Sequence, residues 1–223
     1  LADARAVLSR NQRELGVVLI DIGFGKTSMC AYEEGKLLHA AIFPAGSGNV
    51  TNDLAIGLKV PVETAEAIKL SFGSALARDV SVRDAVELPK LNPKLRGHVS
   101  KRLIAEIIEV RLAEILEFVN NELKSLGKAG RLPAGVVLVG GGAKLPGIVD
   151  LAKQELKLSA QVGIPDLPEV EIIGSPFTAR AEEPEFACAL GLLLWGRDKW
   201  AESKTINLPM KDAIRKLFRY FVP

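Results

Sequence analysis

Hydrophobic residues along the chain follow two periodicities, one typical of strands and one of helices. A continuous apolar run over 15–22 (LGVVLIDI) lies beside glycines and predicts a buried strand. Two further strands are expected over 27–32 and 36–43, joined by a turn at Glu33, Glu34 and Gly35. The chain therefore opens with a three-stranded meander.

The rest of the chain alternates helical patterns with short strands. Helices are expected at about 49–58, 61–70, 99–126, 146–156 and 185–195. The apolar stripe of the longest one consists of Leu103, Ile107, Leu112, Ile115, Leu116, Val119 and Leu123. A weak strand is expected over 80–91 and a short buried strand over 136–139. This order of elements indicates an α/β fold.

Composition narrows the class of protein. The 223 residues are 48% hydrophobic, enough for a large core and too apolar for a disordered chain. A net charge of +2 excludes a nucleic-acid binder that acts through overall basicity. Two cysteines, Cys30 and Cys188, make neither a disulfide framework nor a zinc quartet. Because the chain begins at Leu1 rather than Met, we expect a fragment of a longer protein.

The C-terminal 27 residues differ from the rest in charge and pattern. Residues 197–223 carry seven Lys or Arg and three acidic side chains. A polar linker is expected over 197–209, followed by an amphipathic helix over 210–223. One face of this helix holds Ile214, Leu217, Phe218 and Phe221, and the bases Lys211, Arg215, Lys216 and Arg219 lie opposite. Such a helix binds a membrane interface or packs on its own domain, and the polar linker favours the membrane.

Asp21 stands at the end of the first strand, followed by Gly23 and Gly25. A carboxylate at this place can hold Mg²⁺ through water, and glycines let backbone N–H groups approach phosphate oxygens. The segment is not a Walker loop, because no helix follows and the spacing differs. The alternative is an ordinary hairpin turn.

Three more features can serve a nucleotide. Gly140–Ala143 joins a buried strand to a helix, where exposed N–H groups bind anions. Gly46–Asn49 is another glycine-rich turn before a helix, and Glu66 and Lys69 share a helix face. The alternatives are a tight turn, a plain helix cap and a solvated ion pair.

The order and spacing of these features resemble the second half of an actin-like ATPase, and most closely the FtsA family of bacterial cell-division proteins. The segments that carry the resemblance are ELGVVLIDIGFGKTS (14–28), AIFPAGSGNVTNDLAIGL (41–58), TAEAIK (64–69) and VVLVGGGAKLPGI (136–148). The resemblance covers roughly 1–195 and implies an actin-like ATPase (ribonuclease H-like) fold, second lobe only. It assigns 1–60 and 127–196 to a subdomain IIA and 61–126 to a subdomain IIB.

The resemblance also implies roles for residues. ATP would be bound by the second phosphate loop, the following glycine turn, the adenosine-contacting helix and the adenosine motif. These are Asp21, Gly23, Gly25, Lys26, Thr27, Gly48, Asn49, Glu66, Lys69, Gly141, Gly142 and Ala143. Asp21 would hold Mg²⁺ through water. Lys26 departs from the family, which usually has Thr there, and this bears on hydrolysis more than on binding.

The function implied is a self-assembling, ATP-binding scaffold of the division site. It would tether the FtsZ ring to the inner leaflet of the cytoplasmic membrane, with the FtsZ C-terminal peptide docking on the IIB region. Copies would form a filament, any ATP hydrolysis would be slow and regulatory, the fragment alone would be inactive, and no nucleic acid would be involved. The alternatives are a small-molecule kinase of the same superfamily and a related pilus-assembly scaffold.

Overall fold

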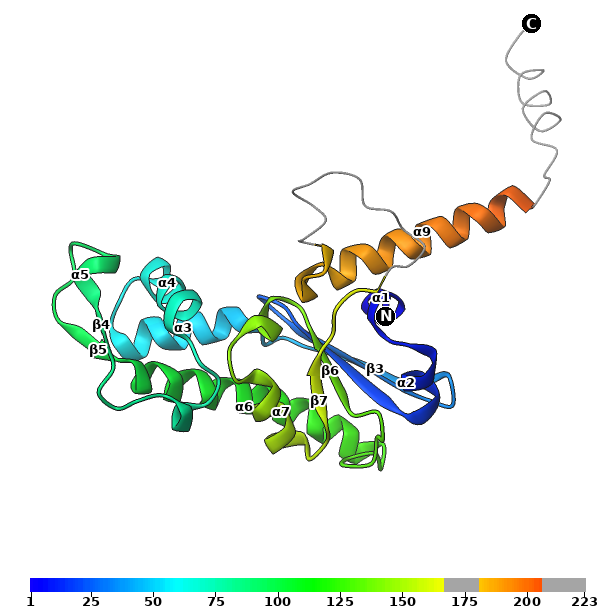
Figure 1. The fold of residues 1–223 in the computed structure, drawn as a ribbon, viewed down its shortest axis with the longest axis horizontal. Helices are drawn as coiled ribbons and strands as arrows, with labels where there is room; N and C mark the ends of the chain where they lie inside the picture. The colour runs from blue at the N-terminus through cyan, green and yellow to red at the C-terminus, as the bar shows by residue number, and fades with distance from the viewer. Residues whose placement is uncertain (167–180, 206–223) are drawn as a thin grey trace, which may run out of the picture.

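A mixed five-stranded sheet forms the centre of the computed structural model, which describes residues 1–166 and 181–205, the last five as backbone only (Figure 1). Its strand order is β3-β2-β1-β6-β7. The strands are β1 (Val17–Ile22), β2 (Thr27–Glu33), β3 (Lys36–Phe43), β6 (Val136–Val139) and β7 (Ala160–Val162). The first three pair antiparallel, and β6 lies parallel to both β1 and β7. The predicted meander is thus confirmed.

Strand β1 is buried on both faces, as its unbroken apolar run predicted. Alternate residues point to opposite sides, so Val18 and Ile20 join one hydrophobic cluster and Val17 and Leu19 join another. The expected turn between β2 and β3 also forms. Glu34 and Gly35 have φ of 51° and 71°, the left-handed conformation that a tight hairpin needs.

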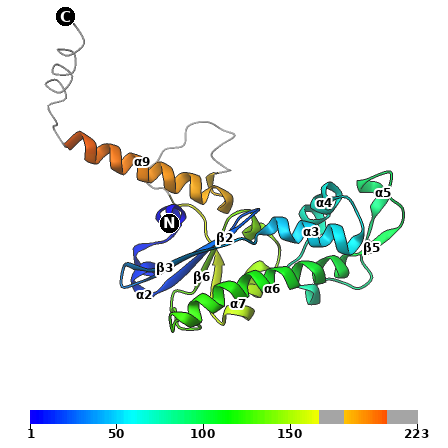
Figure 2. The same ribbon diagram turned by 180° about the vertical axis from the view of Figure 1, so that it is seen from behind.

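Two helices cover the larger cluster (Figure 2). They are α6 (Lys101–Ser125) and α7 (Ile148–Leu156), both close to their predicted ranges. The stripe of α6 is as expected from Leu112 onward, but its first two turns bury Ile104 and Ile108, while Leu103 is 43% exposed. The first turns of α6 lie against α3 (Ser47–Leu58) and the end of α4 (Val62–Phe72), so a different side of the helix is covered there.

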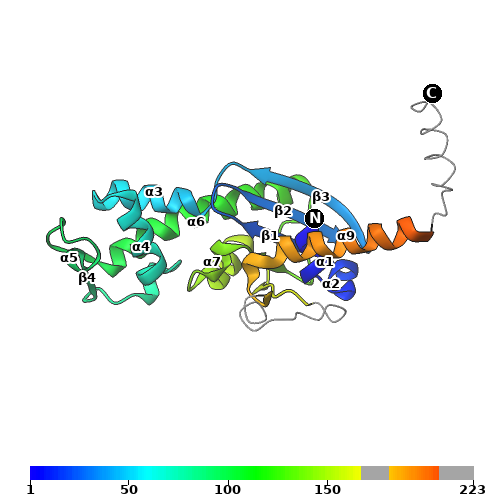
Figure 3. The same cartoon turned by 90° about the horizontal axis from the view of Figure 1, so that it is seen from above.

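The opposite face carries α1 (Ala2–Val7), α2 (Arg10–Leu15), η3 (Pro184–Phe186) and α9 (Ala187–Thr205). Figure 3 shows α9 running alongside α1. The expected linker over 197–209 is wrong in its first part, because α9 stays helical to Thr205. Residues 197–205 contain no proline, and Asp198 forms an ion pair with Arg5 of α1 at 3.0 Å, which links the second half of α9 to α1.

A helical end projects from the sheet away from α9 (Figure 1). It contains α3 (Ser47–Leu58), α4 (Val62–Phe72), η1 (Ala77–Asp79), β4 (Ala85–Glu87), α5 (Leu88–Leu91) and β5 (His98–Ser100). The weak strand expected over 80–91 is mostly wrong, since only Ala85–Glu87 pairs with β5 and Leu88–Leu91 is helical. Helix α3 packs on α4 and α6, so it lies with this end although the sequence division placed it in 1–60.

The amphipathic helix expected over 210–223 lies outside the described residues, and so do all eight of its proposed membrane-binding side chains. Within the described residues, no helix combines the length and apolar composition that crossing a membrane requires.

Candidate functional site

The first glycine loop, Gly23–Lys26, connects β1 to β2 and starts directly after the strand that ends in Asp21 and Ile22. The N–H of Gly23 donates to the carbonyl oxygen of Lys26 at 3.0 Å, which closes the loop. Phe24, Gly25 and Lys26 are exposed, whereas Thr27 is completely buried. The Oγ1 atom of Thr27 has no hydrogen-bond partner among the described residues. The loop thus presents an exposed tip above a buried, unpaired hydroxyl.

Asp21 lies where the first loop meets the Gly140 turn. A Cβ at Gly140 would collide with Asp21 Oδ1, and Gly140 has a φ of 84°, so both space and backbone conformation require glycine. Burial raises the pKa of Asp21 to about 6, and the charge of Asp3 adds to the rise, while Lys26 opposes it. A cation bound at Asp21 would relieve this penalty.

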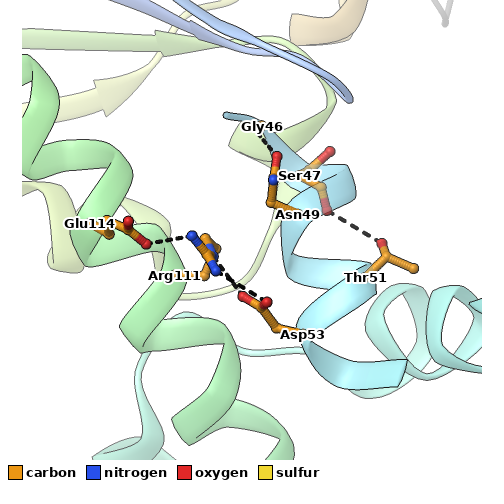
Figure 4. Close-up of polar contacts among 7 residues, drawn as sticks. All are labelled: Gly46, Ser47, Asn49, Thr51, Asp53, Arg111 and Glu114. Atoms are coloured by element: carbon orange, nitrogen blue, oxygen red, sulfur yellow. Dashed lines mark hydrogen bonds and ion pairs between the residues drawn. The ribbon is translucent and has the colours of Figure 1, made fainter. Parts of the chain in front are cut away.

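The glycine turn before α3 is docked on the first loop through its backbone. Ser47 N–H donates to Gly23 O at 2.9 Å, and Gly48 N–H donates to Phe24 O at 2.7 Å. Gly46 N–H donates to the side-chain oxygen of Asn49 at 2.9 Å (Figure 4). The groups of Gly48 and Asn49 that were expected to approach a ligand therefore hold the two loops and the helix start together.

Lys69 is a buried link between α4 and α3 rather than part of a solvated ion pair. Its ammonium donates to Thr51 Oγ1 at 2.8 Å and to Ser47 O at 3.2 Å. It also lies 2.8 Å from Glu66 Oε2, which accepts a hydrogen bond from the Thr51 hydroxyl. Partial burial acts to raise the pKa of Glu66, but the hydrogen bonds from Lys69 and Thr51 outweigh it and hold the pKa below its usual value.

These elements surround a cavity of about 410 Å³. Four of the predicted residues line it: Glu66, Lys69, Gly141 and Gly142. Phe24 and Ser47 bring the first two loops to its wall, and Lys144 and Glu185 contribute charged groups. The other predicted residues, which do not line the cavity, are Asp21, Gly23, Gly25, Lys26, Thr27, Gly48, Asn49 and Ala143. The volume suits a small-molecule ligand.

The two central glycines of the Gly140 turn differ in their surroundings. A Cβ at Gly141 would meet nothing within 4 Å, so this backbone faces open space at the cavity. A Cβ at Gly142 would instead collide with the side chain of Ile22. Gly142 therefore allows the turn to pack against β1, and Gly141 is the glycine that leaves the backbone accessible.

Sequence reasoning did not propose Phe24, Ser47, Thr51, Lys144 or Glu185 as ligand-binding residues. Lys144 forms ion pairs with Glu183 and Glu185, which raise the pKa of Lys144 through hydrogen bonding and charge. Its partners lie about 40 positions further along the chain, so no local pattern connects them. Phe24 could have been singled out from the sequence, because an aromatic side chain between two glycines is exposed unless another segment of the protein or a ligand covers it.

The amino-acid sequence has relatives among known proteins. The family model described as "Cell division protein FtsA" matches residues 18–191. Cell division protein FtsA of Pseudomonas aeruginosa is 32% identical over 208 residues, which cover 93% of this chain and 48% of that protein. The Escherichia coli K12 protein of the same description is 34% identical over 205 residues, covering 89% and 47%. The chain thus spans about half the length of the curated relatives it matches.

Solved structures share the fold at lower sequence identity. MreB 5 of Spiroplasma citri bound to AMPPNP has a TM-score of 0.68 at 15% identity, covering 92% of this chain and 59% of that one. A PilM–PilN type IV pilus biogenesis complex has a TM-score of 0.59 at 21% identity, covering 84% and 47%. These likenesses concern the fold alone, and they confirm the predicted actin-like α/β class.

Proposed function

Because this chain belongs to the FtsA family of cell-division proteins, we propose that it binds ATP with Mg²⁺ in the cavity beside Gly141. The observation that carries the proposal is the convergence of four distant segments on one cavity: the first loop, the turn before α3, helix α4 and the Gly140 turn. MreB 5 of Spiroplasma citri, which shares the fold, was solved with AMPPNP and with ADP.

Residues in the cavity suit the parts of a nucleotide. Glu66 is one-third exposed and can accept hydrogen bonds from ribose hydroxyls, while Lys69 links α4 to α3 through Thr51. The accessible backbone at Gly141 allows a flat base to approach closely. Gly142 and Ala143, the next two residues of the turn, are buried in the protein.

In this proposal Mg²⁺ is held through water by Asp21, which does not line the cavity itself but stands at the end of β1, just before the first loop. In the described part of the chain, no three His, Cys, Asp or Glu side chains group closely enough to hold a metal by themselves. A single carboxylate that acts through water suits Mg²⁺, which keeps most of its hydration shell. Bound Mg²⁺ would neutralise phosphate charge, and its own charge would oppose the rise in pKa that burial imposes on Asp21.

Any hydrolysis is expected to be slow. Lys26, where the family usually has Thr, is exposed at the tip of the first loop, and its charge lowers the pKa of Asp21. A lysine there supplies charge but no hydroxyl. Thr27 has a hydroxyl, but it is buried below the loop and does not reach the cavity. With no hydroxyl from Lys26 or Thr27 at the cavity, we expect the bound nucleotide to regulate assembly rather than to be hydrolysed rapidly.

We further propose that the protein tethers FtsZ to the cytoplasmic side of the membrane at the division site and assembles with copies of itself. The helical end, which includes most of the 61–126 region proposed to bind the FtsZ C-terminal peptide, lies at the far side of the molecule from the end of α9 (Figure 1). The basic 210–223 segment follows α9. Partner and membrane would therefore be engaged at separate ends.

Family membership favours this scaffold over the small-molecule kinase and the pilus-assembly scaffold. The likeness to PilM is 21% in sequence and concerns the fold alone. A kinase also has no use for a basic amphipathic segment after its last helix.

Replacing Gly141 by Val tests the nucleotide site. The new side chain would project into the cavity without touching protein, so we expect ATP affinity to fall by at least about tenfold, or 1.4 kcal/mol, and the melting temperature to stay unchanged. Gly196→Val is the matched control, because Gly196 in α9 also has open space around it and lies away from the cavity. Calorimetric titration with ATP and Mg²⁺ measures the effect, and equal affinity of Gly141→Val and wild type would refute this site.

A further inference from the structure

We propose that Phe24 forms an aromatic wall of the cavity that stacks on the base of the bound nucleotide and selects purines over pyrimidines. This inference rests on the nucleotide-binding function proposed above and specifies which part of the ligand the cavity recognises. Phe24 is 67% exposed and lines the cavity together with Lys69 and Gly141.

The ring of Phe24 is held in a defined place by a glycine on the neighbouring element. A Cβ at Gly48 would lie 2.9 Å from Cε1 and Cζ of the ring and 2.9 Å from Phe24 O. Any other residue at position 48 would therefore push the ring away. The hydrogen bond from Gly48 N–H to Phe24 O, 2.7 Å long, holds the two backbones together at this point.

The buried ammonium of Lys69 supports the ring from another side. Its Nζ lies 5.8 Å from the ring centroid, within the range of a cation–π interaction. The ammonium is itself held by Thr51, Ser47 and Glu66. The ring is thus exposed and yet supported by Gly48 and Lys69, which suits a preformed stacking surface.

The chemistry of the ring decides which part of a nucleotide it contacts. A phenyl ring offers neither positive charge nor a hydrogen-bond donor, so it gains nothing from a phosphate, whereas every base has a π-face. Apolar cavity residues Leu70, Leu145 and Pro146 also suit a base. Since a purine overlaps a six-membered ring over a larger area than a pyrimidine does, stacking favours ATP and GTP over CTP and UTP.

Phe24→Ala and Phe24→Tyr test the inference by calorimetric titration of the purified protein with ATP, CTP, adenosine and tripolyphosphate. Stacking on an aromatic side chain is worth on the order of tenfold in affinity. Phe24→Ala should therefore weaken ATP and adenosine about tenfold, weaken CTP less, and leave tripolyphosphate unchanged. Phe24→Tyr should restore ATP affinity, and Phe24→Leu, which keeps apolar bulk without a π-face, should not.

Thermal melting of each variant gives the control for folding. Because Phe24 is mostly exposed, its variants should melt within a degree or two of wild type. Unchanged or tighter ATP binding by Phe24→Ala would overturn the inference while leaving the nucleotide site intact, and tighter binding would mean that the ring blocks the cavity. If wild type binds neither ATP nor adenosine, the proposed function and this inference both fall.

Discussion

Asp21 is a carboxylate whose surroundings in the folded protein disfavour its charge. It is partly buried, close to the acidic Asp3, and in contact with the Gly140 turn, and these surroundings raise its pKa to about 6. At neutral pH the folded protein therefore holds a carboxylate that would be more stable in water. Carboxyl groups with a raised pKa of this kind are common at functional positions.

The pH dependence of stability follows from this raised pKa. A carboxyl with a higher pKa in the folded state favours folding below its unfolded pKa near 3.8, and this advantage is lost as the pH rises through about 6. Asp21→Asn should therefore be more stable than wild type above pH 6, by about 2 kcal/mol after allowance for solvent screening. The difference should vanish near pH 4, and thermal melts from pH 4 to 8 measure it. A difference that does not change with pH would contradict the assignment.

At the scale of elements, α3 connects the first loop with α4 and α6. Its first turn binds the loop through Ser47 and Gly48, and Thr51 binds Lys69 of α4. Its second turn binds α6 through Asp53, which accepts two hydrogen bonds from Arg111, at 2.6 Å from Nε and 3.1 Å from Nη2 (Figure 4). These bonds raise the pKa of Arg111. The position of the loop over the cavity thus depends on how α3 is held.

Arg111→Ala should destabilise the protein by about 1–2 kcal/mol, since the pair is only about one-quarter exposed and Asp53 would be left without its partner. Asp53→Ala should cost a similar amount, and the double variant less than the sum of the two. Urea denaturation gives the three free energies of unfolding. Glu114→Ala is the control, because Glu114 also pairs with Arg111 but is 45% exposed and should matter less. Additive effects would mean that Asp53 and Arg111 are not coupled.

At the scale of the whole molecule, the C-terminal end of α9 and the helical end lie at opposite ends of the molecule (Figure 3). Packing of α9 on α1, with the Arg5–Asp198 ion pair, keeps the end of α9 on the side away from α5 and β4. A segment that follows α9 can therefore reach a surface without competing with a partner at the helical end. This geometry suits the proposed tether.

The tether is tested with anionic lipid vesicles. Wild type should sediment with them, and Phe218→Glu should not, because it places a charge in the centre of the apolar stripe. Arg215→Ala should only weaken binding, and added salt should reduce binding further by screening the remaining bases. If the 210–223 segment instead packs on its own domain, Phe218→Glu would lower the melting temperature and leave sedimentation unchanged, so each variant is also melted without vesicles.

Local patterns in the sequence determined the strand meander, the positions of the glycine loops and the existence of most helices. They succeeded because each depends on neighbouring residues: Glu34 and Gly35 adopt the turn that joins β2 to β3, and an unbroken apolar run such as Val17–Ile22 needs cover on both faces. The resemblance of the motifs to the FtsA family was sufficient to indicate an actin-like fold, and Glu66, Lys69, Gly141 and Gly142 do meet at one cavity.

Only the tertiary structure decided which groups face a ligand and which face the protein. Gly141 and Gly142 are the same residue type at adjacent positions, yet Gly141 faces open space and Gly142 packs on Ile22. Lys69 is buried because Ser47 and Thr51, from a different helix, accept its hydrogen bonds, and α9 extends to Thr205 beside α1. Contacts between segments distant in the chain leave no periodic signal, because they depend on how whole elements pack rather than on the residues next to them.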